Sequence, residues 1–306
     1  MQDHPPGRRR ALAGALECML WAGTGLLWTV TGGIPRAGLL GQAQAATGFS
    51  FVQISDTHLG FNTAPNPDPV ATLQESLAAA RAATPSLMLH TGDVTHLSRA
   101  GEFDRAVQII GSAGIECRYI PGEHDVVEDD GNSFYARFPA GKDRGGASSF
   151  DAGGVHFIAL NNVMDVKPGK LGTLGAAQLA FLEQDLAGRS ASTPIVVFSH
   201  MPLYVLYEAW GWGTEDGAQA LALLRRFGSV TVLNGHIHQT MQKVEGTLAF
   251  HSGRSTAFPQ NQPGVGRPGP MRDVPAEQLR RMLGISRVAR VPGETPLAVV
   301  SQPLQG

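Results

Sequence analysis

The stretch "FSFVQISDTH", residues 49–58, joins an apolar run to a polar cluster, and it sets the interpretation of the rest of the chain. Residues 49–55 are partly β-branched and aromatic, which predicts a β-strand. Asp56-Thr57-His58 follows where that strand ends and supplies a carboxylate and an imidazole. Because α/β sheets bind ligands at the carboxyl ends of their strands, the stretch predicts a strand together with part of a site.

Strand-like and helix-like segments alternate after this stretch. Further strands are predicted over 86–91, 116–120, 155–161, 194–199, 229–234 and 247–252. Helical periodicity predicts helices over 69–83, 100–111, 174–186 and 218–227. This order predicts one α/β domain with largely buried sheets. A Pro/Gly-rich segment begins at about residue 256, and a short helix (276–283) and a strand near 297–301 are expected to return the chain to the core.

The charge of the chain excludes one class of function. Its 306 residues carry a net charge of -2, and the longest basic cluster is Arg8-Arg9-Arg10. Since a nucleic-acid-binding surface needs a basic patch, we expect no nucleic acid binding. Two cysteines are too few for a disulfide framework. Nothing in the sequence indicates the oligomeric state.

The N-terminal segment has the order of a secretory signal. Arg8-Arg9-Arg10 precedes a mostly apolar run over 11–30, and Ala43-Gln44-Ala45-Ala46 supplies an A-x-A cleavage site. The paired arginines favour the twin-arginine variety. We therefore expect a signal peptide over 1–46, recognised by the export machinery, and a mature domain over 47–306 in the periplasm or outside the cell. An apolar run of about 20 residues can also span a bilayer, so a retained anchor facing outside is the alternative.

Polar clusters end four further predicted strands. They are Gly92-Asp93, Gly122-Glu123-His124-Asp125, Ser199-His200 and Gly235-His236-Ile237-His238. Carboxylates and imidazoles without thiolates suit zinc, manganese and iron. The set exceeds what one ion with open positions needs, whereas two ions sharing a carboxylate would use it fully. Paired ions roughly 3.5–4 Å apart are a standard arrangement for displacement at phosphorus.

This ordered set, from Asp56 to His238, resembles the calcineurin-like metallophosphoesterase family. The resemblance implies a sandwich of two mixed β-sheets flanked by helices (α/β/β/α). It implies one metal on Asp56, His58 and His238, and a second on Glu123, His200 and His236. Asp93 would bridge the two ions, and a metal-bridging hydroxide would be the nucleophile. His124 would assist the leaving group, with Asp125 orienting its ring.

The function implied by the resemblance is a metal-dependent hydrolase of phosphomonoesters or phosphodiesters. Its partner would be a small phosphorylated substrate, and its two ions would be divalent or of mixed valence, drawn from Fe, Mn and Zn. One alternative is a degenerate member of the fold that binds metal or acts as a scaffold without catalysis. Hydrolysis of a non-phosphate ester is a third possibility that the residues leave open.

Glu123 departs from the family pattern, which usually has Asn at this position. A carboxylate here adds a third negative charge to the predicted ligand set. Two hypotheses follow. Either Glu123 binds the second metal and favours a trivalent ion such as ferric iron, or it turns away from the metal and serves as an outer group or base.

Three further residues are candidates for contact with the substrate. His96 follows Asp93 in a loop, and Trp210 and Trp212 lie in an aromatic, glycine-containing stretch after His200. We expect this stretch to form a wall of the substrate entrance, where an aromatic ring could stack on a flat group. The alternative is that the tryptophans pack the loop down and that His96 supports its neighbours.

Overall fold

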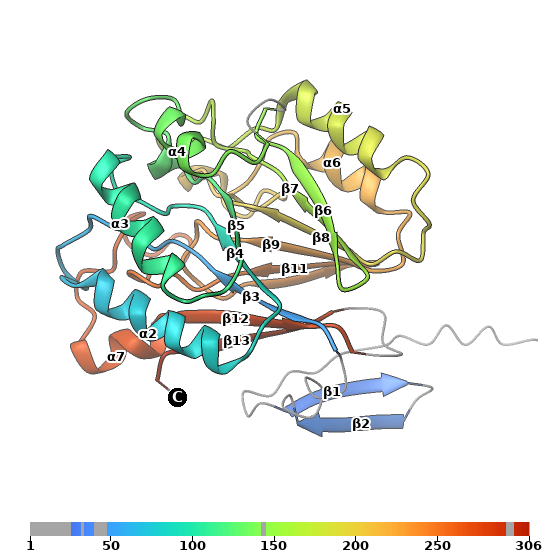
Figure 1. Cartoon of the computed structure of the whole chain (residues 1–306), viewed down its shortest axis with the longest axis horizontal. Helices are drawn as coiled ribbons and strands as arrows, with labels where there is room; N and C mark the ends of the chain where they lie inside the picture. The colour runs from blue at the N-terminus through green and yellow to red at the C-terminus, as the bar shows by residue number, and fades with distance from the viewer. Residues whose placement is uncertain (1–25, 32–33, 40–47, 142–144, 292–296, 306) are drawn as a thin grey trace, which may run out of the picture.

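The computed structural model describes residues 26–31, 34–39, 48–141, 145–291 and 297–305. Its main body is built from two β-sheets that lie against each other, with helices on the outside of both (Figure 1). This is the α/β domain that the sequence pattern predicted, with the α/β/β/α sandwich that the family resemblance implied.

The first sheet has five strands in the order β13-β12-β3-β4-β5. The strands are β3 (Ser50–Ile54), β4 (Leu87–Thr91), β5 (Cys117–Ile120), β12 (Gly284–Ala289) and β13 (Ala298–Pro303). β3, β4 and β5 run parallel, and β12 joins β3 antiparallel. The carboxyl ends of β3, β4 and β5 therefore meet at one edge of the sheet.

The second sheet has six strands in the order β10-β11-β9-β8-β7-β6. They are β6 (Ser148–Ala152), β7 (Val155–Ala159), β8 (Ile195–Ser199), β9 (Val230–Asn234), β10 (Gln242–Glu245) and β11 (Leu248–Ser252). The inner four, β7, β8, β9 and β11, are parallel to one another. The two edge strands run antiparallel to their neighbours.

Each sheet has one face toward the other sheet and one face toward helices. Because strand side chains alternate between faces, Phe51 and Leu89 point into the layer between the sheets, whereas Val52 and Met88 point outward. α2 (Pro69–Ala82), α3 (Ala100–Gly111) and α4 (Asn132–Arg137) cover the outer face of the first sheet. α5 (Gly175–Leu186) and α6 (Gly217–Leu224) cover that of the second. α7 (Ala276–Met282) precedes β12.

The predicted elements were found with small shifts at their ends, and the predicted start of the first helix was right. The Asp68 side chain accepts a hydrogen bond from the backbone N–H of Ala71, as an N-cap residue does. Within the main body, four strands and α-helices were missed, namely β6, β10, β12 and α4. β6 and β10 are short edge strands: β10 is largely exposed, and β6 packs only Phe150 and Ala152 against the core. In β12, Ser286 and Arg287 interrupt the apolar residues.

The predicted signal over 1–46 lies largely outside the described residues. Within it, β1 (Leu26–Thr31) and β2 (Ile34–Leu39) pair as an antiparallel hairpin. Among the described residues, no helix combines the length and the apolar character needed to cross a membrane.

Candidate metal centre

The candidate ligands lie at the carboxyl ends of strands from both sheets. Asp56 and His58 follow β3, Asp93 follows β4, and the 3-10 helix η1 (Glu123–Asp125) follows β5. From the second sheet, His200 follows β8, and His236 and His238 follow β9. The two sheets therefore both contribute candidate ligands, which meet at the edge of the sandwich where the parallel strands end.

Five of these residues have a left-handed backbone, which is unusual for residues other than glycine. Asp56, His58, Asp93, His236 and His238 have φ values of 53°, 39°, 53°, 66° and 51°. Such conformations cost free energy and accumulate at functional sites, where the surrounding structure holds them in place. The tight turns direct the side chains inward, immediately beyond the strand ends.

The first donor set consists of Asp56, His58, Asp93 and His238, all of them buried, with ligand atoms within 4.8 Å of one another. Nε2 of His58 lies 3.3 Å from Nε2 of His238 and 3.3 Å from Oδ2 of Asp93. Nε2 of His238 lies 3.3 Å from Oδ1 of Asp56. These nitrogens and oxygens converge on one point, as the ligands of a single ion do.

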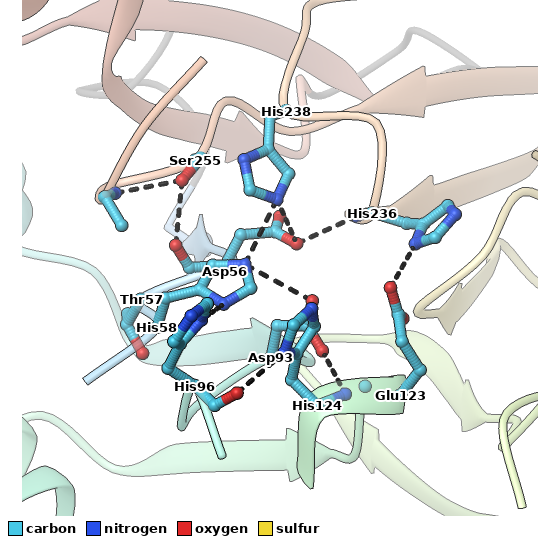
Figure 2. A network of polar contacts seen from close by, with 12 residues as sticks. Asp56, Thr57, His58, Asp93, His96, Glu123, His124, His236, His238 and Ser255 are labelled. Atoms are coloured by element: carbon cyan, nitrogen blue, oxygen red, sulfur yellow. Dashed lines mark hydrogen bonds and ion pairs between the residues drawn. The ribbon is translucent and has the colours of Figure 1, made fainter. Parts of the chain in front are cut away.

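The second donor set consists of Glu123, His200 and His236, whose ligand atoms also lie within 4.8 Å of one another. Figure 2 shows Glu123 and His236 facing each other, apart from the group formed by His58 and His238. Asp93 belongs to both sets, since its Oδ2 is 3.3 Å from Nε2 of His58 and 3.4 Å from Nε2 of His200. It is therefore placed to bridge two ions.

Several donor atoms in these sets are buried without a hydrogen-bond partner among the described residues. They are Oδ2 of Asp56, Oε2 of Glu123, Nε2 of His200, and both ring nitrogens of His236. Of these, Nε2 of His200 and Nδ1 of His236 contact the Glu123 carboxylate as ion pairs, whereas Oδ2 of Asp56 and Nε2 of His236 have no partner of either kind in the described part of the chain. Burying unpaired polar atoms costs free energy, and metal coordination would satisfy them. The ion pairs of the three carboxylates are with histidine rings. The donor types and their convergence fit two ions such as Fe, Mn or Zn.

Hydrogen bonds behind the rings fix which nitrogen faces the centre. Nδ1 of His200 donates to the carbonyl of Thr91 at 2.7 Å, and Nδ1 of His238 donates to the carbonyl of Phe258 at 2.6 Å. Each ring therefore directs its Nε2 toward the centre. Partners of this kind orient metal-binding histidines and set their tautomer.

The charges at the centre shift the pKa values of these groups in opposite directions. Burial, together with the neighbouring ring of His124, holds the pKa of His58 well below its usual value, so this ring is neutral. Burial also acts on His200, but the carboxylates of Asp93 and Glu123 outweigh it and raise its pKa well above the usual value. Burial opposes ionisation of Glu123 as well, yet His236 and His200 lower its pKa well below the usual range. Glu123 is therefore ionised.

The structure corrects the predicted role of Asp125. Its buried carboxylate accepts hydrogen bonds from the backbone N–H groups of Val94, Thr95 and Gly122, at 2.9, 2.8 and 3.0 Å, and from the hydroxyl of Thr95 at 2.8 Å. The ring of His124 is oriented instead by its Nδ1, which donates to the carbonyl of His96 at 2.7 Å. Asp125 thus holds together the loops that follow β4 and β5, rather than the imidazole.

His124 itself lies beside the centre. One of its ring nitrogens is within 4.8 Å of the carboxylates of Asp93 and Glu123, and its ring lies edge-on to His58, with centroids 4.7 Å apart. Burial opposes its protonation, but Asp93 and Glu123 raise its pKa above the usual value. The raised pKa favours the protonated form of this half-buried ring, which is the form that a general acid requires.

The three predicted substrate contacts differ in position. The half-buried ring of His96 stacks on His124, with centroids 5.0 Å apart, and adjoins the centre. The indole of Trp210 is half-buried, but that of Trp212 is only 1% exposed and packs edge-on to His236, with centroids 6.5 Å apart. Stacking of substrate on Trp212 was therefore a wrong expectation, because the indole has no free face. Trp212 supports a candidate ligand instead.

Two residues of the C-terminal segment that support the centre were missed. The hydroxyl of Ser255 donates to the carbonyl of Asp56 at 2.8 Å. The ring of Phe258 lies 4.6 Å from those of His58 and His238, measured between centroids. Ser255 follows the carboxyl end of β11, which is a parallel neighbour of β9. This position at a strand end is the sequence feature from which its place near the centre could have been predicted.

Comparison with known proteins agrees with this geometry. The family model for calcineurin-like phosphoesterases matches residues 49–240, which include every candidate ligand. The chain belongs to the calcineurin-like phosphoesterase family. Membership identifies it as a hydrolase acting on phosphate esters.

Relatives of this calcineurin-like phosphoesterase include enzymes and solved structures. A probable cyclic nucleotide phosphodiesterase of Rhodopseudomonas palustris is 24% identical over 220 residues, which are 68% of this chain and 78% of the relative. A dimetal phosphatase from Danio rerio superposes with a TM-score of 0.62 at 14% identity, covering 84% of this chain and 97% of that one. A purple acid phosphatase from yellow lupin gives 0.61 at 14% identity, over 84% and 51%. These two structures confirm the fold.

Proposed function

We propose that this protein hydrolyses small phosphate esters with two metal ions held at the carboxyl edge of its sandwich. The observation that carries the proposal is the pair of donor sets that share Asp93. Each set supplies two imidazoles and one carboxylate of its own. Two ions at such a site, when bound, lower the pKa of water and offset the charge that develops on a phosphoryl group.

The residues of the chain have separate tasks in this proposal. Asp56, His58 and His238 hold the first ion, Glu123, His200 and His236 hold the second, and Asp93 faces both. His124 donates a proton to the departing oxygen, because its raised pKa favours the protonated ring and the His96 carbonyl fixes the ring's orientation. Asp125 keeps the two ligand-bearing loops in register.

The ester class is the part of the proposal that needs the widest test. One relative is named a probable cyclic nucleotide phosphodiesterase and another a purple acid phosphatase. Both diesters and monoesters therefore belong in the first assay. We infer that the reaction is hydrolysis at phosphorus and that the ions are divalent or of mixed valence, drawn from Fe, Mn and Zn.

The test uses the purified full chain, stripped of metal and reloaded with each ion in turn. Hydrolysis of p-nitrophenyl phosphate, bis(p-nitrophenyl) phosphate and cyclic AMP is measured beside p-nitrophenyl acetate as a non-phosphate control. We expect hydrolysis of at least one phosphate ester that a chelator abolishes and metal restores. Asp93→Asn should abolish it. A metal-loaded chain that cleaves only the acetate, or no ester at all, would refute the proposal in favour of another hydrolase or a scaffold.

We also propose that the protein acts outside the cytoplasmic membrane. The support is the order of residues 1–46, with paired arginines, an apolar run and an A-x-A site. Expression with Arg8 and Arg9 replaced by Lys, followed by cell fractionation, tests it. If the variant stays in the cytoplasm while the wild type is exported, twin-arginine export is supported. If both proteins are distributed equally, twin-arginine export is contradicted.

A further inference from the structure

His96 connects a candidate metal ligand to the candidate acid. Its Nδ1 lies 3.3 Å from Nδ1 of His58, and its backbone carbonyl accepts the hydrogen bond from Nδ1 of His124. Its ring also stacks on that of His124, with an interplanar angle of 13°. Figure 2 shows His96 below His58 and beside the centre. The side chain and the backbone of His96 therefore serve different neighbours.

The position of the protons follows from the contacts of His58. Its Nε2 faces His238 and Asp93 within the first donor set, so a metal there takes the lone pair of this nitrogen. A neutral imidazole with Nε2 free carries its proton on Nδ1. That proton points to Nδ1 of His96 at 3.3 Å, which must then accept it. His96, with Nδ1 as an acceptor, carries its own proton on Nε2.

The far side of the His96 ring has no competing partner. Its Nδ1 is committed to His58, and no hydrogen bond to its Nε2 occurs among the described residues. Phe61 packs against the ring, with centroids 5.3 Å apart, so an apolar edge on one side and His124 on the other hold it in place. Because the ring is only half-buried, the Nε2–H is a fixed donor available to a ligand.

We propose that His96 binds the substrate, with its Nε2–H donating to an oxygen of the phosphoryl group. Nδ1 of His96 lies 3.3 Å from Nδ1 of His58 and the ring stacks on that of His124, so the ring adjoins both a candidate metal ligand and the acid. The assignment rests on the proposed function, since metal binding by His58 imposes the tautomer. It makes His96 a hydrogen-bond donor to the phosphoryl group beside the two ions.

Three variants separate the possible roles of the ring. Gln places its amide nitrogen near the position of Nε2, Asn places its amide near Nδ1, and Phe keeps the stacking but has no polar atom. All three keep the backbone carbonyl that orients His124. Binding of inorganic phosphate to the zinc-loaded full chain is measured by calorimetry, with metal content determined in parallel.

We expect each variant to retain its zinc. Phosphate affinity should fall about 10-fold in His96→Phe and in His96→Asn, and less than about 3-fold in His96→Gln, as the loss of one hydrogen bond to an anion predicts. Nitrogen-15 NMR of the zinc-loaded wild type should show the Nε2–H tautomer for His96. An Nδ1–H tautomer, or phosphate binding by His96→Phe equal to that of the wild type, overturns the assignment. Zinc-loaded wild type that binds no phosphate contradicts the proposed function instead.

Discussion

Oε2 of Glu123 lies 2.7 Å from Nε2 of His200. The other carboxylate oxygen lies 2.9 Å from Nδ1 of His236, so Glu123 joins both imidazoles of the second donor set. Its carboxylate gives that set the same composition as the first, with two rings, one carboxylate of its own and a share of Asp93. This position favours ligation by Glu123 over the alternative in which it turns away.

Replacing Glu123 with Gln or Asn should weaken the second half of the centre. Both changes remove one of three carboxylates, and Asn also shortens the side chain. We expect the metal content after dialysis to fall from two ions per chain toward one, while the first ion stays bound. Elemental analysis measures this. If Glu123 selects a trivalent ion, wild type should keep ferric iron that Glu123→Asn loses. Unchanged metal content in both variants would show that Glu123 is not a ligand.

Gly122 is essential to the position of Asp93. A Cβ added to Gly122 would lie 2.1 Å from Oδ1 of Asp93 and 2.3 Å from its backbone nitrogen. Gly122→Ala must therefore displace the shared carboxylate or the loop after β5, and we expect loss of both ions. Gly101→Ala is the matched control, because nothing lies within 4 Å of its Cβ and Ala favours a helix. Equal metal content in the two variants would contradict this account.

The sequence predicted the clustering of the candidate ligands better than it predicted the residues that contact them. The clustering of Asp56, His58 and Asp93 could be predicted because residue type and position at a strand end are local features. The burial of Trp212 and the contacts of Phe258 depend on loops that meet only after folding. No local pattern shows such contacts.

Asp125 shows the same limit more sharply. Its place next to His124 suggested a carboxylate that orients an imidazole, but its hydrogen bonds go to the loop after β4 and to Gly122. The prediction of the strands had a similar limit. Buried parallel strands such as β8 were evident from their continuous apolar runs, whereas β12 was missed because Ser286 and Arg287 interrupt its apolar residues.

Asp125→Asn should reduce stability more than it changes acid catalysis. Each carboxylate oxygen accepts two hydrogen bonds, so an amide nitrogen in place of either one faces two donors. We expect a loss of about 2–4 kcal/mol in the free energy of unfolding, measured with urea. The pH of half-maximal activity assigned to His124 should stay in place. A normal stability with a shifted pH profile would restore the ring-orienting role.

His251 should make the fold sensitive to acid. Burial lowers its pKa from 6.5 to about 4, and its Nδ1 has no hydrogen-bond partner among the described residues. As the pH falls below 6.5, the unfolded chain takes up a proton that the folded chain does not, so stability is lost until the pH reaches about 4.

The matched variant is His251→Gln, which cannot titrate. Between pH 7.5 and pH 5, wild type should lose about 2 kcal/mol more than the variant in urea unfolding. The metal-site histidines are the same in both proteins, so their contribution to the pH dependence of stability cancels in the difference between the two. Parallel pH curves for the two proteins would show that His251 is protonated or solvated in the folded chain.

The most direct test of two cooperating ions is a metal titration of the stripped full chain, with ester hydrolysis followed at each step. We predict that hydrolysis of a phosphate ester stays low at one ion per chain and rises as the second ion binds. In Asp93→Asn, which lacks the shared carboxylate, no rise should occur at any metal level. Hydrolysis that reaches its maximum at one ion per chain, or that persists without metal, would contradict the account.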